Sequence, residues 1–177
     1  MSIGRTKAIA LIGLEGIPVD IEADVASGLP RFAVVGLPDR SLSEATDRVR
    51  SAIVNSGLSM PSQRVTVNLS PAGIPKTGTA FDLSIAIAAL VASGQVPSES
   101  AAKCVHVGEL ALDGRLRPAR GILPAVLGAQ RSGVTTVVVP AANQAEAELV
   151  EGMRVIALAS LRDVAVWHGA KLEPISV

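Results

Sequence analysis

The chain has 177 residues, of which 49% are hydrophobic and 18% charged, and 16 Lys and Arg residues balance 16 Asp and Glu residues. A chain this long and apolar can bury a core of its own, so the composition indicates one folded domain and excludes a wholly disordered chain. Because the net charge is zero, no overall field draws in nucleic acid or an anionic membrane, and any basic site must be a local patch.

The single cysteine, Cys104, excludes an internal disulfide and is typical of a reducing compartment. The N-terminus lacks the apolar segment of a signal peptide, and no apolar run reaches membrane-spanning length without breakers. We therefore expect a cytoplasmic protein without membrane contact. Cys104 and His106 lie in one apolar run far from the other histidine, which favours strand residues over ligands, so no metal site is expected.

The first half of the chain consists mainly of expected strands. Lys7–Leu14 and Val19–Val25 are β-prone runs on either side of the turn-rich Glu15–Pro18, a pattern that predicts a hairpin. A third strand is expected over Arg31–Val35, and it ends at the turn residues Gly36–Asp39.

One amphipathic helix follows these strands. Ser41 and Glu44 have the spacing of a capping box, apolar residues then recur at helical spacing, and Asn55–Gly57 closes the segment. The polar face carries Arg48 and Arg50, among other charged residues, and a solvated surface is its simplest interpretation.

The stretch Val65–Gly94 joins a strand to a helix that has no polar face. Apolar residues alternate through Val65–Leu69, as in a strand with one buried face. Almost every residue in Ala80–Ala92 is apolar, so this helix must be covered on most sides. Thr79, with Asp82 three residues on, offers its N-cap. The loop before it resembles a phosphate loop only superficially, because Thr79 stands where that motif needs Lys.

The second half alternates strands with helices, which predicts a single α/β domain with a mixed sheet. Asp113-Gly114 is a signal for a two-residue hairpin turn. Strands are expected over Lys103–Leu112, Arg115–Arg117, Val134–Val139 and Arg154–Leu158. A helix is expected over Pro124–Arg131. A second helix should follow Asn143, which caps it together with Glu146, and a third should run from a cap of Ser160 and Asp163 to about His168.

Four motifs in this chain occur in the order in which one bacterial family has them. They span Val35–Asp39, Arg48–Ile53, Val67–Ala72 and Lys76–Leu83. Over roughly residues 7–168 the chain closely resembles the N-terminal domain of the magnesium-chelatase-like AAA+ proteins, the ComM or YifB family. The resemblance implies a Lon-protease-like α/β (α+β) domain with the ribosomal protein S5 domain 2-like fold.

In that family the domain precedes an ATPase, and ComM members act in DNA branch migration during natural transformation. The resemblance implies a non-catalytic domain that positions DNA or partners for an ATP-driven helicase, which works as a homo-oligomeric ring, a hexamer. ATP and Mg²⁺ belong to the ATPase domain, whose motif these 177 residues lack. We therefore interpret residues 1–177 as one domain of a longer protein, with its core at about 7–168 and no cofactor of its own.

Lon peptidases carry Lys-x-Gly-Pro-Ser-Ala-Gly, and Lys76–Asp82 aligns on this motif with Ala80 in place of the nucleophilic Ser. Val107–Pro118 resembles the Thr-Gly-Glu-Ile-Thr-Leu-x-Gly segment of Lon, and counting on to Lon's catalytic Lys reaches Ala125. A Ser–Lys dyad needs both groups, so the resemblance implies the scaffold without the peptidase. Thr79 is a conceivable substitute nucleophile, but it is the expected N-cap and no base is evident for it.

Three functions stay open. The first is a module that contacts DNA or a partner through clustered cations. The candidates are Arg115, Arg117 and Arg120 around the hairpin turn, Arg48 and Arg50 on the first helix, and Lys76 in the central loop. Solvated arginines explain the same residues, and with two Phe, one Trp and no Tyr the chain offers few stacking platforms for single strands.

The second function is a hydrolase with an unrecognised dyad, which requires a Ser or Thr in hydrogen-bond reach of a Lys in a pocket. The third is an assembly module that only packs against its neighbours in the ring while the ATPase makes every contact with DNA. Salt-dependent binding of DNA separates the first function from the third.

Overall fold

The computed structural model describes residues 2–71, 76 and 80–172. A mixed seven-stranded sheet has the order β3-β4-β2-β1-β5-β8-β9, and a two-stranded sheet pairs β6 with β7. The strands are β1 Ser2–Ile12, β2 Glu15–Ala26, β3 Arg31–Val35, β4 Arg64–Ser70, β5 Val105–His106, β6 Glu109–Leu110, β7 Leu116–Arg117, β8 Thr136–Pro140 and β9 Arg154–Leu158. The predicted mixed α/β fold is confirmed.

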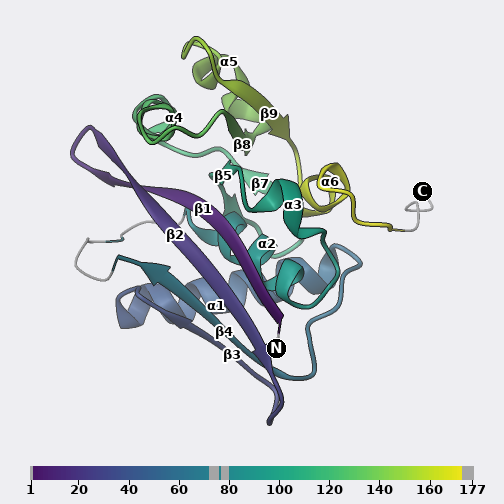
Figure 1. Cartoon of the computed structure of the whole chain (residues 1–177). Coiled ribbons are helices and arrows are strands. Elements are labelled where there is room, and N and C mark those ends of the chain that lie inside the picture. The colour runs from purple at the N-terminus through teal and green to yellow at the C-terminus, as the bar shows by residue number, and fades with distance from the viewer. Residues whose placement is uncertain (1, 72–75, 77–79, 173–177) are drawn as a thin grey trace.

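The helices are α1 Asp39–Asn55, α2 Asp82–Ala92, α3 Ser98–Ala101, α4 Ile122–Arg131, α5 Gln144–Ala147 and α6 Leu161–Trp167, with a 3-10 turn η1 Ala141–Asn143. Figure 1 shows α4 and α5 beside β8 and β9 at one end of the molecule, and α1 beside β3 and β4 at the other. None of the described helices is long and apolar enough to cross a membrane.

The sheet changes character at β1. On one side of it β1, β2 and β4 pair antiparallel, with β3 parallel to β4 at the edge. On the other side β1, β5, β8 and β9 run parallel. Parallel strands need crossover connections. The connection from β5 to the parallel strand β8 runs through the β6–β7 hairpin and helix α4.

The first hairpin turns earlier than the sequence suggested. Ile12 lies opposite Glu15, so the turn is the pair Gly13-Leu14 and the predicted turn residues Glu15–Pro18 begin β2. Gly13 has a φ of +63°, which Gly adopts without the strain of a side chain. The hairpin itself, and the strands over Arg31–Val35 and Val65–Leu69, are confirmed.

Helix α2 forms the centre of the larger core, and all eleven of its residues are buried. It contacts β1, β2 and α1, so neighbours cover most of its surface as its composition predicts. Thr79, the predicted N-cap, lies outside the described residues. Helices α4 and α5 bury a second core against the other face of the parallel strands. The β8 residues Val137 and Val139 belong to this second core and Val138 to the first, which confirms a strand buried on both faces.

The helix caps were predicted with mixed success. Ser160 Oγ accepts a hydrogen bond from Asp163 N (3.1 Å) and starts α6, as expected. The predicted capping box of Ser41 and Glu44 is wrong, because α1 begins at Asp39 directly after Pro38 and Ser41 lies inside the helix. The restricted backbone of Pro38 starts α1 in place of a side-chain cap.

The expected strand over Lys103–Leu112 is broken at Gly108 into β5 and β6. Gly108 N donates to Ala80 O (3.1 Å) and Gly108 O accepts from Leu83 N (3.1 Å), so its backbone bonds to the start of α2 and not to a strand. The second hairpin forms where Asp113-Gly114 predicted it, but its loop has three residues, closed by a bond from Ala111 N to Arg115 O (2.9 Å).

Candidate functional site

A cavity of about 360 Å³ opens where β1 and the segment after β5 diverge. Its described walls are mostly apolar and consist of Ile9, Leu11, Ala80, Phe81, Val107, Glu109, Pro118, Ala119, Arg120 and Ala125. We call it the Ala80–Ala125 cavity, because it brings together the two positions that the Lon alignment singled out. These residues are 45 positions apart in sequence, and the fold brings them to one cavity.

The floor of the cavity is built by the break between β5 and β6. β1 pairs with β5 only where Lys7 lies opposite Val105. Beyond that pair the chain turns away from β1, and the two backbone bonds of Gly108 hold it against Ala80 and Leu83. The start of α2 is thereby fixed at the bottom of the gap.

Asn143 holds the opposite wall in place. Its Oδ1 accepts from Ala119 N (2.9 Å) and its Nδ2 donates to Ala119 O (3.0 Å). Glu146 Oε1 accepts from Leu123 N (3.2 Å) in the first turn of α4. Asn143 is the N-cap residue of α5, as predicted, but neither predicted side chain makes a capping bond, since both bond to the chain around the start of α4 instead. Their sequence spacing could not show a partner more than twenty residues away.

Helix α4 reaches the cavity because it crosses the first hairpin at two glycines. A Cβ built on Gly128 would lie 2.6 Å from the carbonyl oxygen of Gly16, closer than real Cβ contacts allow. The absence of both side chains lets α4 lie directly on the hairpin. Ala125, one turn earlier on the same helix, then faces the cavity and is 4% exposed.

The described walls carry two ionisable groups, Glu109 and Arg120, and no hydroxyl, thiol, amine or imidazole. The described walls contain neither Ser nor Lys and so cannot supply a Ser–Lys dyad, and Ala80 and Ala125 present methyl groups at the positions that the resemblance to Lon marked. The proposed substitute nucleophile, Thr79, lies outside the described residues. What the arrangement offers chemically is an apolar recess with one charge of each sign at its rim.

Arg48, a predicted DNA contact, is held inside the domain. Its Nε and Nη2 donate to the two carboxylate oxygens of Asp82 at 2.7 and 3.0 Å, and the two side chains are 18% and 1% exposed. Leu110 N adds a third bond to Asp82 (3.1 Å). Burial raises the pKa of Asp82, against the effect of Arg48, while the hydrogen bonds that Arg48 donates to Asp82 raise the pKa of Arg48. The pair joins α1, α2 and β6.

Lys76, predicted to contact DNA from the central loop, is 2% exposed, and its Nζ donates to Pro71 O (2.6 Å). Its ammonium is therefore turned into the domain. Arg50, the other candidate on α1, is exposed. Of the two predicted contacts on that helix, Arg48 and Arg50, only Arg50 presents its charge to solvent.

Arg115 and Arg117 flank the buried Leu116 and are both exposed, so they project from the same side of the hairpin by the alternation of strand side chains. Arg115 Nε also bonds Asp113 Oδ2 (2.8 Å) within the turn. Arg120 is exposed too, but it lines the Ala80–Ala125 cavity. The structure thus separates the three predicted arginines into a pair on the hairpin and one at the cavity.

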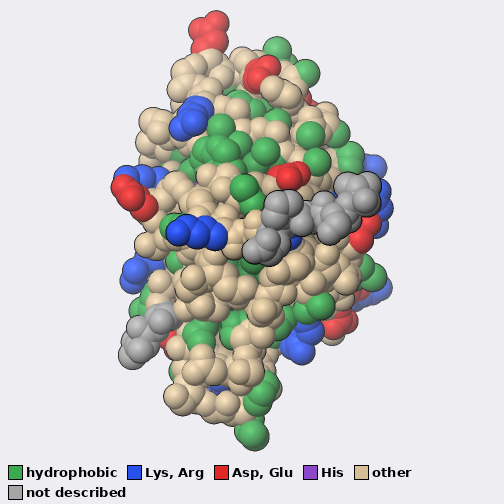
Figure 2. Space-filling view, turned by 90° about the vertical axis from the view of Figure 1, so that its right-hand side faces the viewer, with side chains coloured by type: hydrophobic (Ala, Val, Ile, Leu, Met, Phe, Trp, Pro, Cys, Tyr) green, Lys and Arg blue, Asp and Glu red, His purple; other side chains and the backbone are tan. Residues whose placement is uncertain are grey.

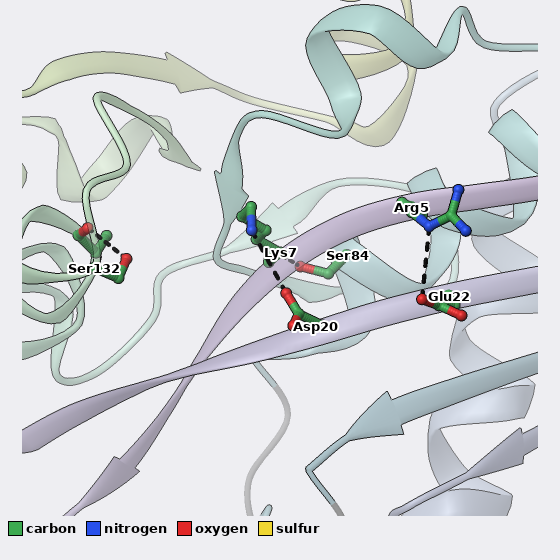
Figure 3. A network of polar contacts seen from close by, with 7 residues as sticks. Arg5, Lys7, Asp20, Glu22, Ser84 and Ser132 are labelled. Carbon is green, nitrogen blue, oxygen red and sulfur yellow. Dashed lines mark hydrogen bonds and ion pairs between the residues drawn. The ribbon is translucent and has the colours of Figure 1, made fainter.

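Two basic residues on the first hairpin are paired with acidic ones. On the outer face of the first hairpin, Arg5 lies opposite Glu22 (3.6 Å) and Lys7 opposite Asp20 (3.5 Å), as Figure 3 shows. On the face drawn in Figure 2, Lys and Arg side chains are interspersed with Asp and Glu and do not gather into one patch. A polyanion could therefore bind only at a local group of charges, such as Arg115 and Arg117 on the second hairpin.

A buried polar chain joins α3, α6 and β5. Ser100 Oγ lies 2.6 Å from His168 Nδ1, and His168 Nε2 lies 2.8 Å from His106 Nε2. Burial lowers the pKa of His168 to about 4 and, with the neighbouring His168, that of His106 to about 3. None of the three lines the Ala80–Ala125 cavity. Sequence spacing gave no signal for this chain, because its members are 62 and 68 residues apart.

No three of the described His, Cys, Asp and Glu side chains form a metal-binding group.

Comparison with known proteins gives consistent relatives. The family model for subunit ChlI of Mg-chelatase matches residues 21–143. A protein of Mycobacterium tuberculosis is 48% identical over 167 residues, which cover 94% of this chain and 33% of the relative. Competence protein ComM of Haemophilus influenzae is 41% identical over 164 residues, 93% of this chain and 32% of ComM. YifB of Escherichia coli is 41% identical over 152 residues, 86% of this chain and 30% of YifB.

The chain therefore belongs to the Mg-chelatase ChlI family, in the branch that contains ComM and YifB, as the motifs predicted. It spans about a third of the length of the relatives it matches. A more distant match is a Lon protease of Salinispora arenicola, 26% identical over 175 residues, which cover 91% of this chain and 22% of the protease. This match agrees with the resemblance to Lon proteases seen in the sequence.

Proposed function

We propose that the chain is a non-catalytic domain of a ComM/YifB-type AAA+ ATPase, and that it positions DNA or a partner for ATP-driven branch migration in natural transformation and recombination. The name of the Haemophilus influenzae relative, a competence protein, supports a role in DNA uptake. In this proposal ATP and Mg²⁺ act in a separate ATPase domain, outside these 177 residues.

The observation that carries the non-catalytic part is the composition of the Ala80–Ala125 cavity. Lon-type hydrolysis needs a nucleophile and a base within hydrogen-bond reach, and the aligned positions carry methyl groups. Among the described residues, Ser100 with His168 is a hydroxyl–base pair at hydrogen-bond distance. It is a weak candidate, because an imidazole whose pKa is lowered to about 4 is a poor general base at neutral pH.

DNA contact is proposed through Arg115 and Arg117. Two exposed arginines on one side of a hairpin can bind phosphates, but they supply no array of groups that reads bases. Binding by one domain should therefore be weak and indifferent to sequence. In a hexameric ring each copy would add one weak contact to a shared duplex, and linked contacts gain affinity through effective concentration.

The test is a salt titration of binding to a duplex of random sequence, followed by fluorescence anisotropy at low ionic strength. For the variant Arg115→Ala/Arg117→Ala, the slope of log affinity against log salt should become shallower by about 1.8, the value for two phosphate contacts. The matched control, Arg40→Ala/Arg131→Ala, removes two exposed arginines elsewhere. Its slope should equal that of the wild type.

An unchanged slope in the hairpin variant would exclude these arginines. It would leave the assembly module, which packs against its neighbours in the ring without touching DNA, as the better proposal. Ring assembly of the full-length protein that fails without this domain would then be the supporting result.

A further inference from the structure

We propose that the Ala80–Ala125 cavity binds an extended polypeptide segment, which adds a strand to the free edge of β1 and places an apolar side chain in the cavity and an acidic group beside Arg120. This inference names a ligand class and a site that the proposed DNA contact does not use. It stands whether or not Arg115 and Arg117 touch DNA.

The first observation is the free edge. β1 continues to Ile12, but its pairing with β5 consists of Lys7 opposite Val105 alone, and no other described strand pairs with β1 on that side. Ser84 Oγ lies between the diverging strands, 3.2 Å from Lys7 O and 2.8 Å from His106 O. The carbonyl of Lys7 therefore points across the gap.

Backbone direction alternates along a strand, so the N–H and C=O groups of Ile9 and Leu11 point the same way as those of Lys7, into the gap. Both residues line the cavity. Among the described residues, no backbone group bonds to these groups of Ile9 and Leu11. A strand edge of this kind is what an extended peptide adds to in β-augmentation, where main-chain bonds give affinity and pockets for side chains give specificity.

The second observation is the character of the recess beside that edge. Its volume of about 360 Å³ lies at the lower end of the range of ligand pockets, roughly 300–1,000 Å³, and methyl groups and apolar side chains form most of its surface. That surface suits one apolar side chain projecting from a strand paired with Ile9 and Leu11. A nucleic acid is a poor occupant, because the acidic Glu109 stands in the wall and the ring of Phe81 is buried.

The third observation is the charge at the rim. Arg120 is exposed and lines the cavity, and it follows Ala119, whose backbone Asn143 holds from both sides. The guanidinium is therefore carried by a fixed segment. An acidic side chain next to the apolar residue of the peptide complements this charge.

The experiment is an NMR titration of the ¹⁵N-labelled chain with heptapeptides that carry Leu or Gly at the centre, Glu or Lys beside it, and Gly and Ser elsewhere. The Leu–Glu peptide should cause saturable shifts of the Ile9, Leu11 and Ala119 amides by about 1 mM. The Gly peptide should not. The same peptide N-methylated next to Leu, which removes a donor that strand pairing needs, should bind about tenfold more weakly.

Charge reversal supplies the matched protein variants. Arg120→Glu should lower the affinity for the Leu–Glu peptide about tenfold and raise the affinity for the Leu–Lys peptide. Arg117→Glu, a charge reversal at an exposed residue outside the cavity, should leave both affinities within about twofold of the wild type. Absence of saturable shifts, shifts confined to residues away from the cavity, indifference to N-methylation, or equal effects of the two variants would each overturn the inference. Mass spectrometry of the titrated peptide separates the two proposals, because a cleaved peptide would defeat the non-catalytic function while leaving the binding site standing.

Discussion

Arg48 and Asp82 form a two-point ion pair between α1 and α2, with both nitrogen–oxygen distances at or below 3.0 Å and the carboxylate almost wholly buried. A further bond from Leu110 N attaches β6 to the same carboxylate. Because Asp82 is the first residue of α2, the pair fixes that helix next to Ala80 and sets the floor of the cavity.

Removing Arg48 should destabilise the domain severely. Arg48→Ala leaves the Asp82 carboxylate buried without its charge partner, and breaking a buried pair in this way costs about 3–5 kcal/mol. Asp82→Asn should cost less, because the amide oxygen still accepts from Leu110 N and the charge left without a partner, Arg48, is 18% exposed, whereas the Asp82 carboxylate is 1% exposed. Urea unfolding measures the loss of unfolding free energy in both variants. The control is Arg50→Ala, which removes an exposed arginine from the same helix. A loss below about 1 kcal/mol for Arg48→Ala would show that the pair is dispensable.

Stability should fall as the pH is lowered from 6.5 toward 4. Burial keeps His106 and His168 neutral, with pKa values lowered to about 3 and about 4, whereas the unfolded chain takes up protons near the ordinary value of 6.5. The contribution of the neutral pair is fully present above pH 6.5 and is lost as the pH falls. Linkage sets the slope at up to about 1.4 kcal/mol per pH unit for each histidine.

Urea unfolding between pH 7 and pH 4.5 measures that slope. His168→Gln removes one titrating imidazole and keeps a polar side chain toward Ser100 and His106. The slope of its unfolding free energy against pH should be shallower than that of the wild type by the amount that corresponds to about one proton. Identical slopes would mean that His168 is protonated in the folded chain as readily as in the unfolded one.

A charge in α2 should be far more damaging than a charge on the surface. Ile87 is 0% exposed, so Ile87→Asp buries a carboxylate without a partner and should cost more than about 4 kcal/mol or prevent folding. Val54, near the end of α1, is 55% exposed, and Val54→Asp should change stability by less than about 1 kcal/mol. Thermal melts compare the two, and equal melting temperatures would contradict the burial of α2.

Local sequence signals predicted the elements well and their partners poorly. Ser160 and Asp163 form the predicted cap because both groups lie within one turn of chain. Asn143 and Glu146 have the same spacing but bond to Ala119 and Leu123, which only the folded chain brings near. Spacing shows which residues could cap a helix, and tertiary contacts decide whether they do so.

The candidate site was predicted in part. Alignment on Lon found Ala80 and Ala125, and the fold places both in one cavity. Composition could not show that Arg48 is bound by Asp82 or that Lys76 is turned into the domain, because an arginine or lysine has the same sequence signature whether it is paired or free. The free edge of β1 depends on the break at Gly108, which appeared in sequence as one glycine in a continuous strand.

Mass spectrometry of an unfolded protein incubated with the chain tests most directly whether this domain is non-catalytic. Casein at neutral pH, with and without the chain, is the substrate. We expect no fragments above the control, because methyl groups occupy the positions of nucleophile and base. Fragments whose yield rises with the concentration of the chain and follows it through a second purification would contradict the proposed function.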